Sequence, residues 1–566
     1  MNKYALGLDF GTNSCRALLV DVANGRELAT HVYPYPSGRD GVIVDAADPN
    51  LARQNPADYI KGIEATIKGV LKKAKSARKN FNPSDVVGIG VDTTGSSPMP
   101  VDAQGKPLCF DARFKKNPAA MVWLWKDHTG YAEAKLITET AAAHRPQYLA
   151  KIGGVYSSEW YWSKILHCKN TSPEVFKAAD SWVEICDWIT AVLIGELEPK
   201  KIKRSICAAG HKAMFNQRWQ GLPDENFLES LSPGLGALRS RLYDEALTSE
   251  NAAGRISDKW SAKLGLSNTV AVSVGAFDAH MGAVGAGIST GTLVKIIGTS
   301  TCDIMIHPNR ETLNDIPGVC GIVDGSVMGG YYGIEAGQSG VGDIFLWFVN
   351  NLVPESYGKT QDDKFRNLEK AASKLKVGES GLLALDWNNG NRTILVDVRL
   401  SGLLIGETLH TTPHEIYRAL MEATAYGALA IIDRIQEYGV SISEVINCGG
   451  LASKSPLLMQ IYADVTGRPM KISRSGQTPA LGAAIFGAVA AGKSAGGYDS
   501  VGDATQAMTG SGKVFAPIAS NHEIYRKLYA LYHQLHDGFG TKEWNGNMYN
   551  VMKELLDLRD SVRRTS

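Results

Sequence analysis

Two short polar turns of the same type are the residues best suited to chemistry in this 566-residue chain. Gly11-Thr12-Asn13 and Gly298-Thr299-Ser300 each follow an apolar run and lead into another, which predicts strand, tight turn and strand in each half. Such turns present backbone N–H groups and hydroxyls, and these groups bind anions. Two similar turns that face each other predict a polyphosphate held between two similar domains.

Two acids lie where strands are predicted to end. Asp9 ends the first strand, just before Gly11, and Asp278 ends an apolar strand punctuated by glycine. A lone aspartate at a strand end is usually a turn-former, but a carboxylate beside bound phosphates needs a cation, so Asp9 is predicted to hold Mg²⁺. For Asp278 the residues leave two interpretations open, a helix cap and a catalytic base that faces a cleft.

The elements that must position these groups alternate between strands and helices. Residues 56–71 carry apolar side chains at spacings of three and four, with Asn55 as the cap and Pro56 in the first turn. This alternation predicts α/β layers in both halves. We expect a boundary and a hinge in the glycine-rich segment near residue 285. Strands are also predicted over 86–91 and 445–448, and helices over 415–432, 455–465 and 480–491.

One pattern is misleading. Residues 487–494 satisfy G-x-x-x-x-G-K-S, the phosphate loop of a different ATPase class. That loop needs a strand before it and a helix that begins at Lys493-Ser494, whereas here an alanine-rich helix precedes it. Gly492 is therefore predicted to end this helix in the left-handed conformation rather than to bind phosphate.

Composition argues against several classes of protein. A net charge of +1 gives no sign of a nucleic-acid partner or an anionic membrane surface. No apolar run reaches the roughly 18 residues of a membrane span, and the first residues lack the pattern of a secretory leader. The eight cysteines are scattered without a C-x-x-C pair. We therefore expect a cytoplasmic protein with reduced thiols rather than disulfides or a zinc site.

Taken together, the segments resemble the FGGY family of carbohydrate kinases, within the actin and heat-shock ATPase superfamily. Residues 8–12 and 297–300 resemble the two phosphate motifs, 447–454 the adenosine motif, and 402–422 the C-terminal signature. Glu407 and Leu420 depart from that signature, and we interpret them as subfamily variation.

The resemblance implies an α/β fold of two ribonuclease H-like (actin-like ATPase) domains with a cleft between them. Residues 1–285 would hold the sugar site and the first phosphate turn, and 286–566 the second phosphate turn and the adenosine motif.

The resemblance also implies roles for individual residues. Asp278 would be the catalytic base and Asp9 the Mg²⁺ ligand. ATP would be bound by Gly11, Thr12, Asn13, Gly298, Thr299, Ser300, Gly449, Gly450 and Lys454. The sugar would be bound by Ser96, Trp125, Asp127, Lys212, Asp278 and Glu335. For two of these positions plainer interpretations stay open: a solvated lysine in a loop for Lys212, and a helix-starting acid for Glu335.

Within the family, several segments are most similar to those of L-ribulokinases: residues 90–96, 123–129, 156–160, 209–212, 275–282 and 335–339. Where this chain has Gly95-Ser96, glycerol kinases carry Arg-Glu and xylulose kinases Met-His, so both are disfavoured. The resemblance implies that ATP and Mg²⁺ are used to phosphorylate the terminal hydroxyl of a ketopentose, L-ribulose to L-ribulose 5-phosphate in L-arabinose catabolism.

Two alternatives are kept. The chain could be another kinase of this family, acting on xylulose, ribitol or another polyol, or a nucleotide-gated binding protein like the chaperone and actin branches of the superfamily. The expected partners are the sugar and ATP, without nucleic acid or membrane. A homodimer is left open, as are the accepted epimers.

Overall fold

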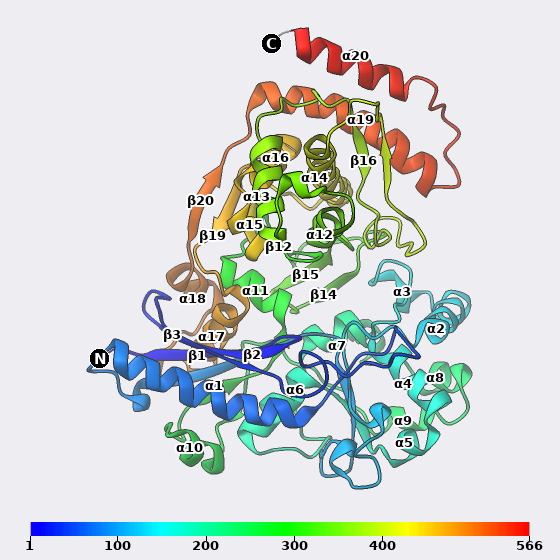
Figure 1. The fold of residues 1–566 in the computed structure, drawn as a ribbon. Helices are drawn as coiled ribbons and strands as arrows, with labels where there is room; N and C mark the ends of the chain where they lie inside the picture. The colour runs from blue at the N-terminus through cyan, green and yellow to red at the C-terminus, as the bar shows by residue number, and fades with distance from the viewer. Residues whose placement is uncertain (1, 565–566) are drawn as a thin grey trace.

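The computed structural model describes residues 2–564, and within them the chain folds around two mixed seven-stranded sheets (Figure 1). The first sheet has the order β3 (Glu27–Pro34), β2 (Ser14–Asp21), β1 (Tyr4–Phe10), β5 (Val86–Thr93), β10 (Ala271–Ser273) and β9 (Ala252–Arg255), with β11 (Ala276–Phe277) beside β5. The second sheet has the order β14 (Gly321–Asp324), β15 (Tyr331–Ala336), β13 (Thr301–Pro308), β12 (Thr292–Ile297), β18 (Glu444–Cys448), β19 (Met470–Ser473) and β20 (Ser511–Phe515).

The two sheets repeat one connection pattern. β1 pairs antiparallel with β2 and parallel with β5, and β12 pairs antiparallel with β13 and parallel with β18. The two Gly-Thr turns therefore occupy equivalent places, at the ends of β1 and β12. The predicted strand–turn–strand repeat and the α/β class are confirmed.

Helix α1 (Pro56–Ala77) shows how local sequence signals set an element. The Asn55 side chain accepts a hydrogen bond of 3.0 Å from the Ala57 N–H, so this residue caps the helix as predicted. Tyr59, Ile63 and Ile67 are fully buried, and α1 packs with this apolar face against β2 and β3.

The remaining elements of the first half are mostly short. Its helices are α2 (Tyr131–His144), α3 (Gln147–Ala150), α4 (Tyr161–Thr171), α5 (Pro173–Ala178), α6 (Ile185–Ile194), α7 (Ile206–Lys212), α8 (Glu225–Leu231), α9 (Gly236–Arg239) and α10 (Asp258–Leu264). Two strand pairs join its loops: β4 (Arg53–Gln54) with β7 (Val122–Trp123), and β6 (Pro98–Val101) with β8 (Ser181–Glu184).

The second half carries longer helices, with α20 at its far end (Figure 1). Its helices are α12 (Gly342–Asn351), α13 (Gln361–Ala372), α14 (Pro413–Glu437), α15 (Gly450–Lys454), α16 (Pro456–Thr466), α18 (Val501–Met508), α19 (Ala519–Gly540) and α20 (Val551–Arg564). β16 (Leu383–Leu385) pairs with β17 (Leu403–Ile405).

Helices α11 (Asp278–Ala286) and α17 (Thr478–Ala491) pack against each other between the two sheets. A Cβ at Gly285 would lie 2.0 Å from the Thr478 carbonyl oxygen, so small residues let these helices touch. The glycine-rich segment that was predicted to be a hinge thus lies largely within α11. Whether the halves rotate about it stays a prediction, as does the boundary at 285.

The misleading phosphate-loop pattern belongs to this contact. α17 packs on β1 and β5, and a Cβ at Gly88 would lie 1.8 Å from the Gly487 carbonyl oxygen. α17 ends at Ala491, and Gly492 has positive φ as predicted (φ 76°, ψ 161°). Its ψ, however, lies in the extended region open only to glycine, so the predicted left-handed helical conformation is wrong.

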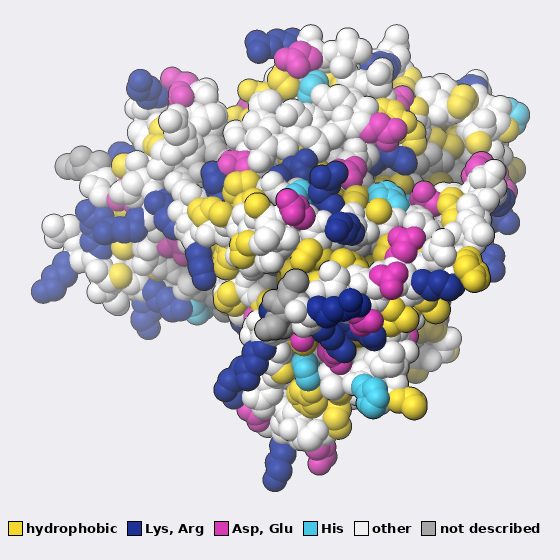
Figure 2. All heavy atoms as spheres, turned by 90° about the horizontal axis from the view of Figure 1, so that it is seen from above, with side chains coloured by type: hydrophobic (Ala, Val, Ile, Leu, Met, Phe, Trp, Pro, Cys, Tyr) yellow, Lys and Arg dark blue, Asp and Glu magenta, His cyan; other side chains and the backbone are white. Residues whose placement is uncertain are grey.

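Two further expectations concern surface and thiols. Among residues 2–564 no helix is long and apolar enough to span a membrane. Basic and acidic side chains are interspersed over the face seen in Figure 2, in line with the near-zero net charge. The eight cysteines, which all lie in the described part of the chain, are free thiols.

Candidate active site

The two phosphate turns are closed by short backbone hydrogen bonds. The Gly11 N–H donates to the Ser14 carbonyl over 3.0 Å, and the Gly298 N–H to the Ser300 carbonyl over 2.9 Å. Gly298 and Thr299 are exposed although β12 before them is largely buried. Each turn thus presents backbone groups at the end of a rigid strand, which is what anion binding requires.

The glycines of the predicted adenosine motif differ from each other. Gly449 has φ +93°, and a Cβ there would lie 2.3 Å from the Ile297 carbonyl oxygen. A Cβ at Gly450 would meet no described atom within 4 Å. Gly449 is therefore required by the fold itself, whereas Gly450 faces open space beside the second phosphate turn. Lys454 ends α15 and is exposed.

Three carboxyl groups gather at the end of the first sheet. Asp9 on β1 lies opposite Asp92 on β5 in the strand register, and Asp278 follows β11, which is also paired with β5. Burial raises the pKa of Asp9, and the nearby Arg16 guanidinium, 3.4 Å away, offsets part of that rise. Burial and the charges of Asp9 and Asp278 raise the pKa of Asp92 well above its usual range.

Asp278 is the first residue of α11, and Phe277 is the N-cap. Oδ1 of Asp278 accepts a hydrogen bond of 2.7 Å from the Ala279 N–H, as the side chain of a helix-capping residue does. Burial and the neighbouring Asp9 carboxylate raise the pKa of Asp278 to about 7. The local geometry therefore contains elements of both interpretations, a group that stabilises a helix end and a carboxylate poised to exchange a proton near neutral pH.

Lys212 and Glu335 join the two halves. Lys212 ends α7 in the first half, and its Nζ lies 2.8 Å from Oε1 of Glu335, which stands on β15 of the second sheet. The Lys212 ammonium also lies over the ring of Trp160, 5.2 Å from its centre. Burial lowers the pKa of Lys212, but the Glu335 carboxylate raises it by more, so the pKa of Lys212 is raised. Burial raises the pKa of Glu335, but the Lys212 ammonium holds it far below its usual range. Both groups are charged near neutral pH, and both act on the pKa of Asp278.

Trp125 connects the predicted sugar side to the first phosphate turn, because its Nε1 donates a hydrogen bond of 3.0 Å to Thr12 Oγ1. Asn13, at the tip of the same turn, is exposed and donates from Nδ2 to the Asp40 carbonyl over 2.6 Å.

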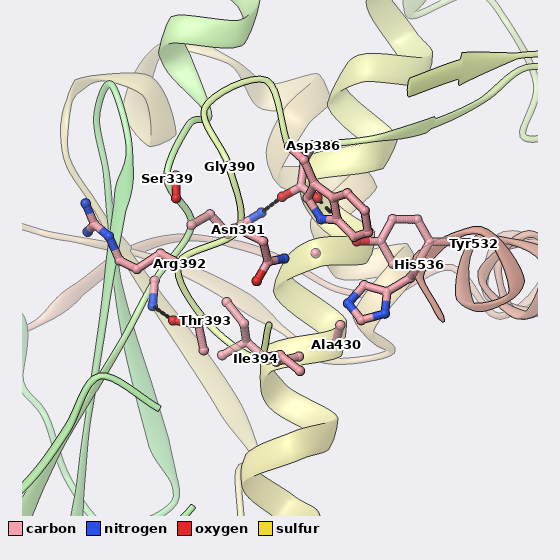
Figure 3. A pocket seen from close by; sticks show the side chains of 15 residues that line it. Ser339, Asp386, Gly390, Asn391, Arg392, Thr393, Ile394, Ala430, Tyr532 and His536 are labelled. Carbon is pink, nitrogen blue, oxygen red and sulfur yellow. Dashed lines mark hydrogen bonds between the residues drawn. The ribbon is translucent and has the colours of Figure 1, made fainter. Parts of the chain in front are cut away.

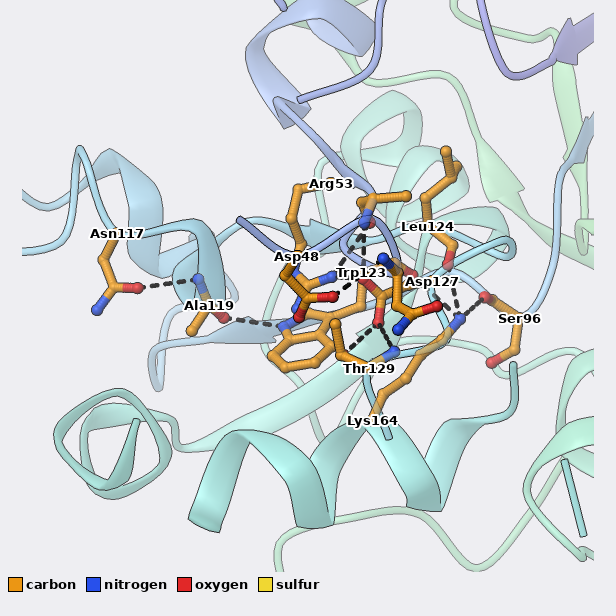
Figure 4. Close-up of polar contacts among 12 residues, drawn as sticks. Asp48, Arg53, Ser96, Asn117, Ala119, Trp123, Leu124, Asp127, Thr129 and Lys164 are labelled. Atoms are coloured by element: carbon orange, nitrogen blue, oxygen red, sulfur yellow. Dashed lines mark hydrogen bonds and ion pairs between the residues drawn. The ribbon is translucent and has the colours of Figure 1, made fainter. Parts of the chain in front are cut away.

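Asp127 is fully buried within a polar network that Figure 4 displays. One carboxylate oxygen pairs with Arg53 and accepts from the Ala52 N–H over 2.8 Å, and the other accepts from the Thr129 hydroxyl over 2.6 Å. These contacts occupy both oxygens, so the geometry favours a role in holding the Trp125 loop over direct contact with a sugar.

Ser96 is buried in a neighbouring network. Its hydroxyl donates to Glu184, and its carbonyl accepts from Lys164 Nζ over 2.7 Å (Figure 4). The proton of the Ser96 hydroxyl is thus engaged, which leaves only its lone pairs for a sugar.

Four residues near the site were not assigned from the sequence. They are Asp92, two buried histidines, His211 and His280, and Arg392, whose charge acts on the pKa values of Cys302 and Cys320. His211 and His280 lie inside the segments that carry the resemblance, and Asp92 lies near the end of β5, just before the polar turn; these local positions could have indicated all three. Arg392 sits in an irregular loop, and its sequence context gave no such signal.

A separate small pocket lies in the second half, lined by Asp386, Asn391, Tyr532 and His536 among others (Figure 3). Arg392 points away from it in Figure 3. The pocket lining includes no residue of the phosphate turns. We therefore place the candidate active site at the turns and not in this pocket.

Comparisons with known proteins identify the family of the chain. Residues 4–285 match the FGGY family of carbohydrate kinases, N-terminal domain, and residues 293–491 the C-terminal domain of that family. A ribulokinase of Geobacillus thermodenitrificans is 43% identical, covering 99% of this chain and 98% of the relative. A ribulokinase of Halalkalibacterium halodurans is 42% identical, covering 100% and 99%.

Solved structures show the same fold at low identity. A gluconate kinase from Lactobacillus acidophilus superposes with a TM-score of 0.76 at 17% identity, covering 96% of this chain and 99% of that one. A ligand-bound xylulose kinase from the same organism gives 0.76 at 19% identity, covering 95% and 99%. The predicted two-domain, actin-like architecture is thereby confirmed. By the family match over both halves, the chain belongs to the FGGY family of carbohydrate kinases.

Proposed function

We propose that this enzyme uses ATP to phosphorylate the terminal hydroxyl of ribulose, with L-ribulose as the substrate and L-ribulose 5-phosphate as the product. As a kinase of this family it acts on a sugar and ATP. The ribulokinases at 40–43% identity over nearly the whole chain support ribulose over xylulose or a polyol. A cytoplasmic location and a homodimer remain predictions.

Positioning and charge neutralisation carry most of the rate in phosphoryl transfer. In our proposal the ATP phosphates lie between the Gly11-Thr12 and Gly298-Thr299 turns. Thr12 accepts a hydrogen bond from Trp125 at its oxygen, so its own O–H proton is left to donate to a phosphate oxygen. The open face at Gly450 lets the backbone approach the nucleotide closely.

The carboxyl groups at the end of the first sheet fit a hard divalent cation. Burial is the main cause of the raised pKa values of Asp9, Asp92 and Asp278, and the carboxyl groups of Asp9 and Asp92 lie within hydrogen-bond reach of each other. Buried carboxylates this close together stay ionised more easily when a cation binds them. Asp9, beside the first turn, would hold Mg²⁺. When bound, the ion would neutralise charge on the phosphates.

Asp278 is the proposed catalytic base. Its carboxylate accepts the proton of the sugar's terminal hydroxyl while the hydroxyl oxygen bonds to the γ-phosphorus and the bond from that phosphorus to the β,γ-bridging oxygen breaks. Lys212 and Glu335 are the proposed sugar contacts, with Ser96 and Trp125 on the same side. Since Lys212 and Glu335 come from different halves, closure of the cleft would assemble the sugar site and exclude water.

The single observation that carries this proposal is the place of Asp278, which follows β11 at the end of the first sheet. Asp9 on the phosphate side and the Lys212–Glu335 pair on the other side both act on its pKa. A panel of ketopentoses with coupled ADP detection tests it. We expect ADP release that depends on L-ribulose and Mg²⁺. A faster rate with xylulose or ribitol would favour the alternative substrates, and slow turnover unaffected by any sugar would favour a nucleotide-gated binding protein.

A further inference from the structure

Two buried histidines flank Glu335 at the end of the proposed sugar site. Nδ1 of His211 lies 3.4 Å from Oε2 of Glu335, and Nε2 of His280 lies 3.8 Å from the same oxygen. His211 and His280 are 0% and 2% exposed. One potential ligand atom from each of the three residues lies within 4.8 Å of the other two. Two bonds of about 2.0–2.2 Å to one metal ion can span the 3.4 and 3.8 Å separations from Glu335.

The hydrogen bonds of His211 direct a lone pair at Glu335. Ser326 Oγ donates to the Val323 carbonyl over 3.2 Å, so it accepts from Nε2–H of His211, 2.9 Å away. This assignment leaves Nδ1 unprotonated, and it faces the carboxylate oxygen. Two acceptors at 3.4 Å repel each other unless positive charge lies close to them. The Lys212 ammonium, 3.1 Å from the same oxygen, supplies part of that charge, and a metal ion bound by Nδ1 and Oε2 would supply the rest.

His280 offers further ring nitrogens that could bind a metal ion. Neither ring nitrogen of His280 has a hydrogen-bond partner among residues 2–564, although both are buried. Burial lowers the pKa of His280 to about 4 and the pKa of His211 well below its usual range. Both imidazoles are therefore neutral near pH 7, the form that binds metal ions.

We propose that His211, His280 and Glu335 form a binding site for a late first-row divalent metal such as Zn²⁺, separate from the Mg²⁺ position at Asp9. Imidazole nitrogens with one carboxylate favour Zn²⁺, Co²⁺ or Ni²⁺ over Mg²⁺, which prefers oxygen ligands. The proposed function makes Glu335 a sugar contact as well. On that basis, a metal ion bound to Glu335 competes with ribulose and inhibits the enzyme.

The proposed ligand oxygen of Glu335 also has a cationic neighbour. Lys212 Nζ donates to both carboxylate oxygens of Glu335, to Oε1 over 2.8 Å and to Oε2 over 3.1 Å, and the two imidazoles also face Oε2. An ion at Oε2 therefore replaces the second of these bonds and leaves the first in place. The carboxyl of Asp278, which acts on the same ion pair, balances part of the added positive charge. A Cβ at Gly321 would lie 2.2 Å from Nδ1 of His211, so only glycine at this position keeps a side chain off that nitrogen.

The test is metal binding without ATP or sugar, by calorimetry with Zn²⁺ and by the visible absorption of Co²⁺. A second group, His533, His536 and Asp537, could also bind a metal. The matched control is therefore His533→Gln, which should leave the sugar-side site intact. His280→Phe should weaken binding there by at least about tenfold. Gly321→Ala, which places a methyl group against Nδ1, should do the same without removing a ligand.

Kinetics give the second measurement. In the wild-type enzyme and in His533→Gln, Zn²⁺ should raise the KM for ribulose and leave the KM for ATP unchanged. The proposal is overturned if folded His280→Phe and Gly321→Ala bind the metal as the wild type does, or if Zn²⁺ competes with ATP instead of ribulose. Metal binding in an enzyme that does not phosphorylate ribulose would reject the proposed function and leave the metal site standing.

Discussion

The indole Nε1 of Trp125 donates a hydrogen bond of 3.0 Å to Oγ1 of Thr12, and so a residue from the proposed sugar side supports the first phosphate turn. Gln54 adds a hydrogen bond of 2.6 Å from its Nε2 to the Thr12 carbonyl. The buried pair of Arg53 and Asp127 holds the two loops that supply Gln54 and Trp125. The shape of the turn therefore depends on residues far from it in sequence.

Trp125→Phe should lower kcat/KM for ATP, since the aromatic bulk stays but the hydrogen bond to Thr12 is lost. One such bond contributes about 0.5–1.5 kcal/mol, so we expect a loss on the order of 2- to 12-fold. Steady-state kinetics with varied ATP measures it. Trp347→Phe, at a Trp that is 44% exposed, is the matched control and should change nothing. If folded Trp125→Phe keeps the wild-type kcat/KM for ATP, the hydrogen bond to Thr12 does not contribute to ATP use.

Asp278→Asn separates a base from a cap. The amide keeps shape and can cap a helix, but it cannot accept the sugar proton, so kcat should fall by about 10²–10⁴-fold. Sugar affinity should change much less, which calorimetric titration with ribulose measures. A variant that binds ribulose normally and keeps more than about a tenth of kcat contradicts the role as base.

The two neighbouring glycines of the adenosine motif should respond differently to alanine. In Gly449→Ala the positive φ and the 2.3 Å approach to the Ile297 carbonyl oxygen oppose the new Cβ, so the free energy of unfolding should fall by at least about 1–2 kcal/mol. Gly450→Ala meets open space, so its stability should match the wild type while its KM for ATP rises. Denaturant unfolding and ATP kinetics on both variants check this. Equal stability of the two would contradict the structure at Gly449.

Local pattern was sufficient for much of the fold. Apolar runs of strand length on either side of the Gly-Thr turns, and the Asn55 cap, predicted elements that the structure contains, because these signals act within a few residues. Gly282–Gly287 was different. A glycine-rich run is typical of a hinge, but here its small residues let α11 touch α17, a contact between segments about 200 residues apart that local sequence does not encode.

The site was predictable in the same uneven way. Asp9 and Asp278 stand at strand ends next to recognisable turns, so their position followed from the pattern. Asp92 is brought to Asp9 only by the register of two parallel strands. His211, His280 and Glu335 meet because the two halves meet, and no spacing in the sequence indicates that contact.

The pH dependence of kcat/KM for ribulose should have an acid limb. Asp278 accepts a proton only when ionised, and burial and Asp9 raise its pKa from 3.8 to about 7. Activity should therefore fall as pH drops below about 7, approaching tenfold per unit. The folded state also binds the proton of Asp278 more tightly than the unfolded state does. The stability that protonated Asp278 contributes to the fold is therefore lost as pH rises through about 7. Melting temperatures across the range exclude unfolding as the cause of the limb. A flat profile down to pH near 5 would contradict the raised pKa.

Asp9→Asn should weaken the use of Mg²⁺ while leaving the fold intact. The amide cannot balance a divalent cation, and Arg16, 3.4 Å from the Asp9 carboxylate, would then lie beside a neutral group. We expect the Mg²⁺ concentration for half-maximal rate to rise by about 10- to 100-fold, an effect typical of groups that orient a bound ion.

The matched control is Asp40→Asn: Asp40 is exposed, lies near the same turn, and has a positive φ that asparagine tolerates. Binding of Mn²⁺ to the enzyme–ADP complex, measured by electron paramagnetic resonance, gives a readout independent of turnover. If Asp9→Asn and Asp40→Asn bind Mn²⁺ equally well, the ion is held elsewhere, and Asp92 or Asp278 becomes the residue to test.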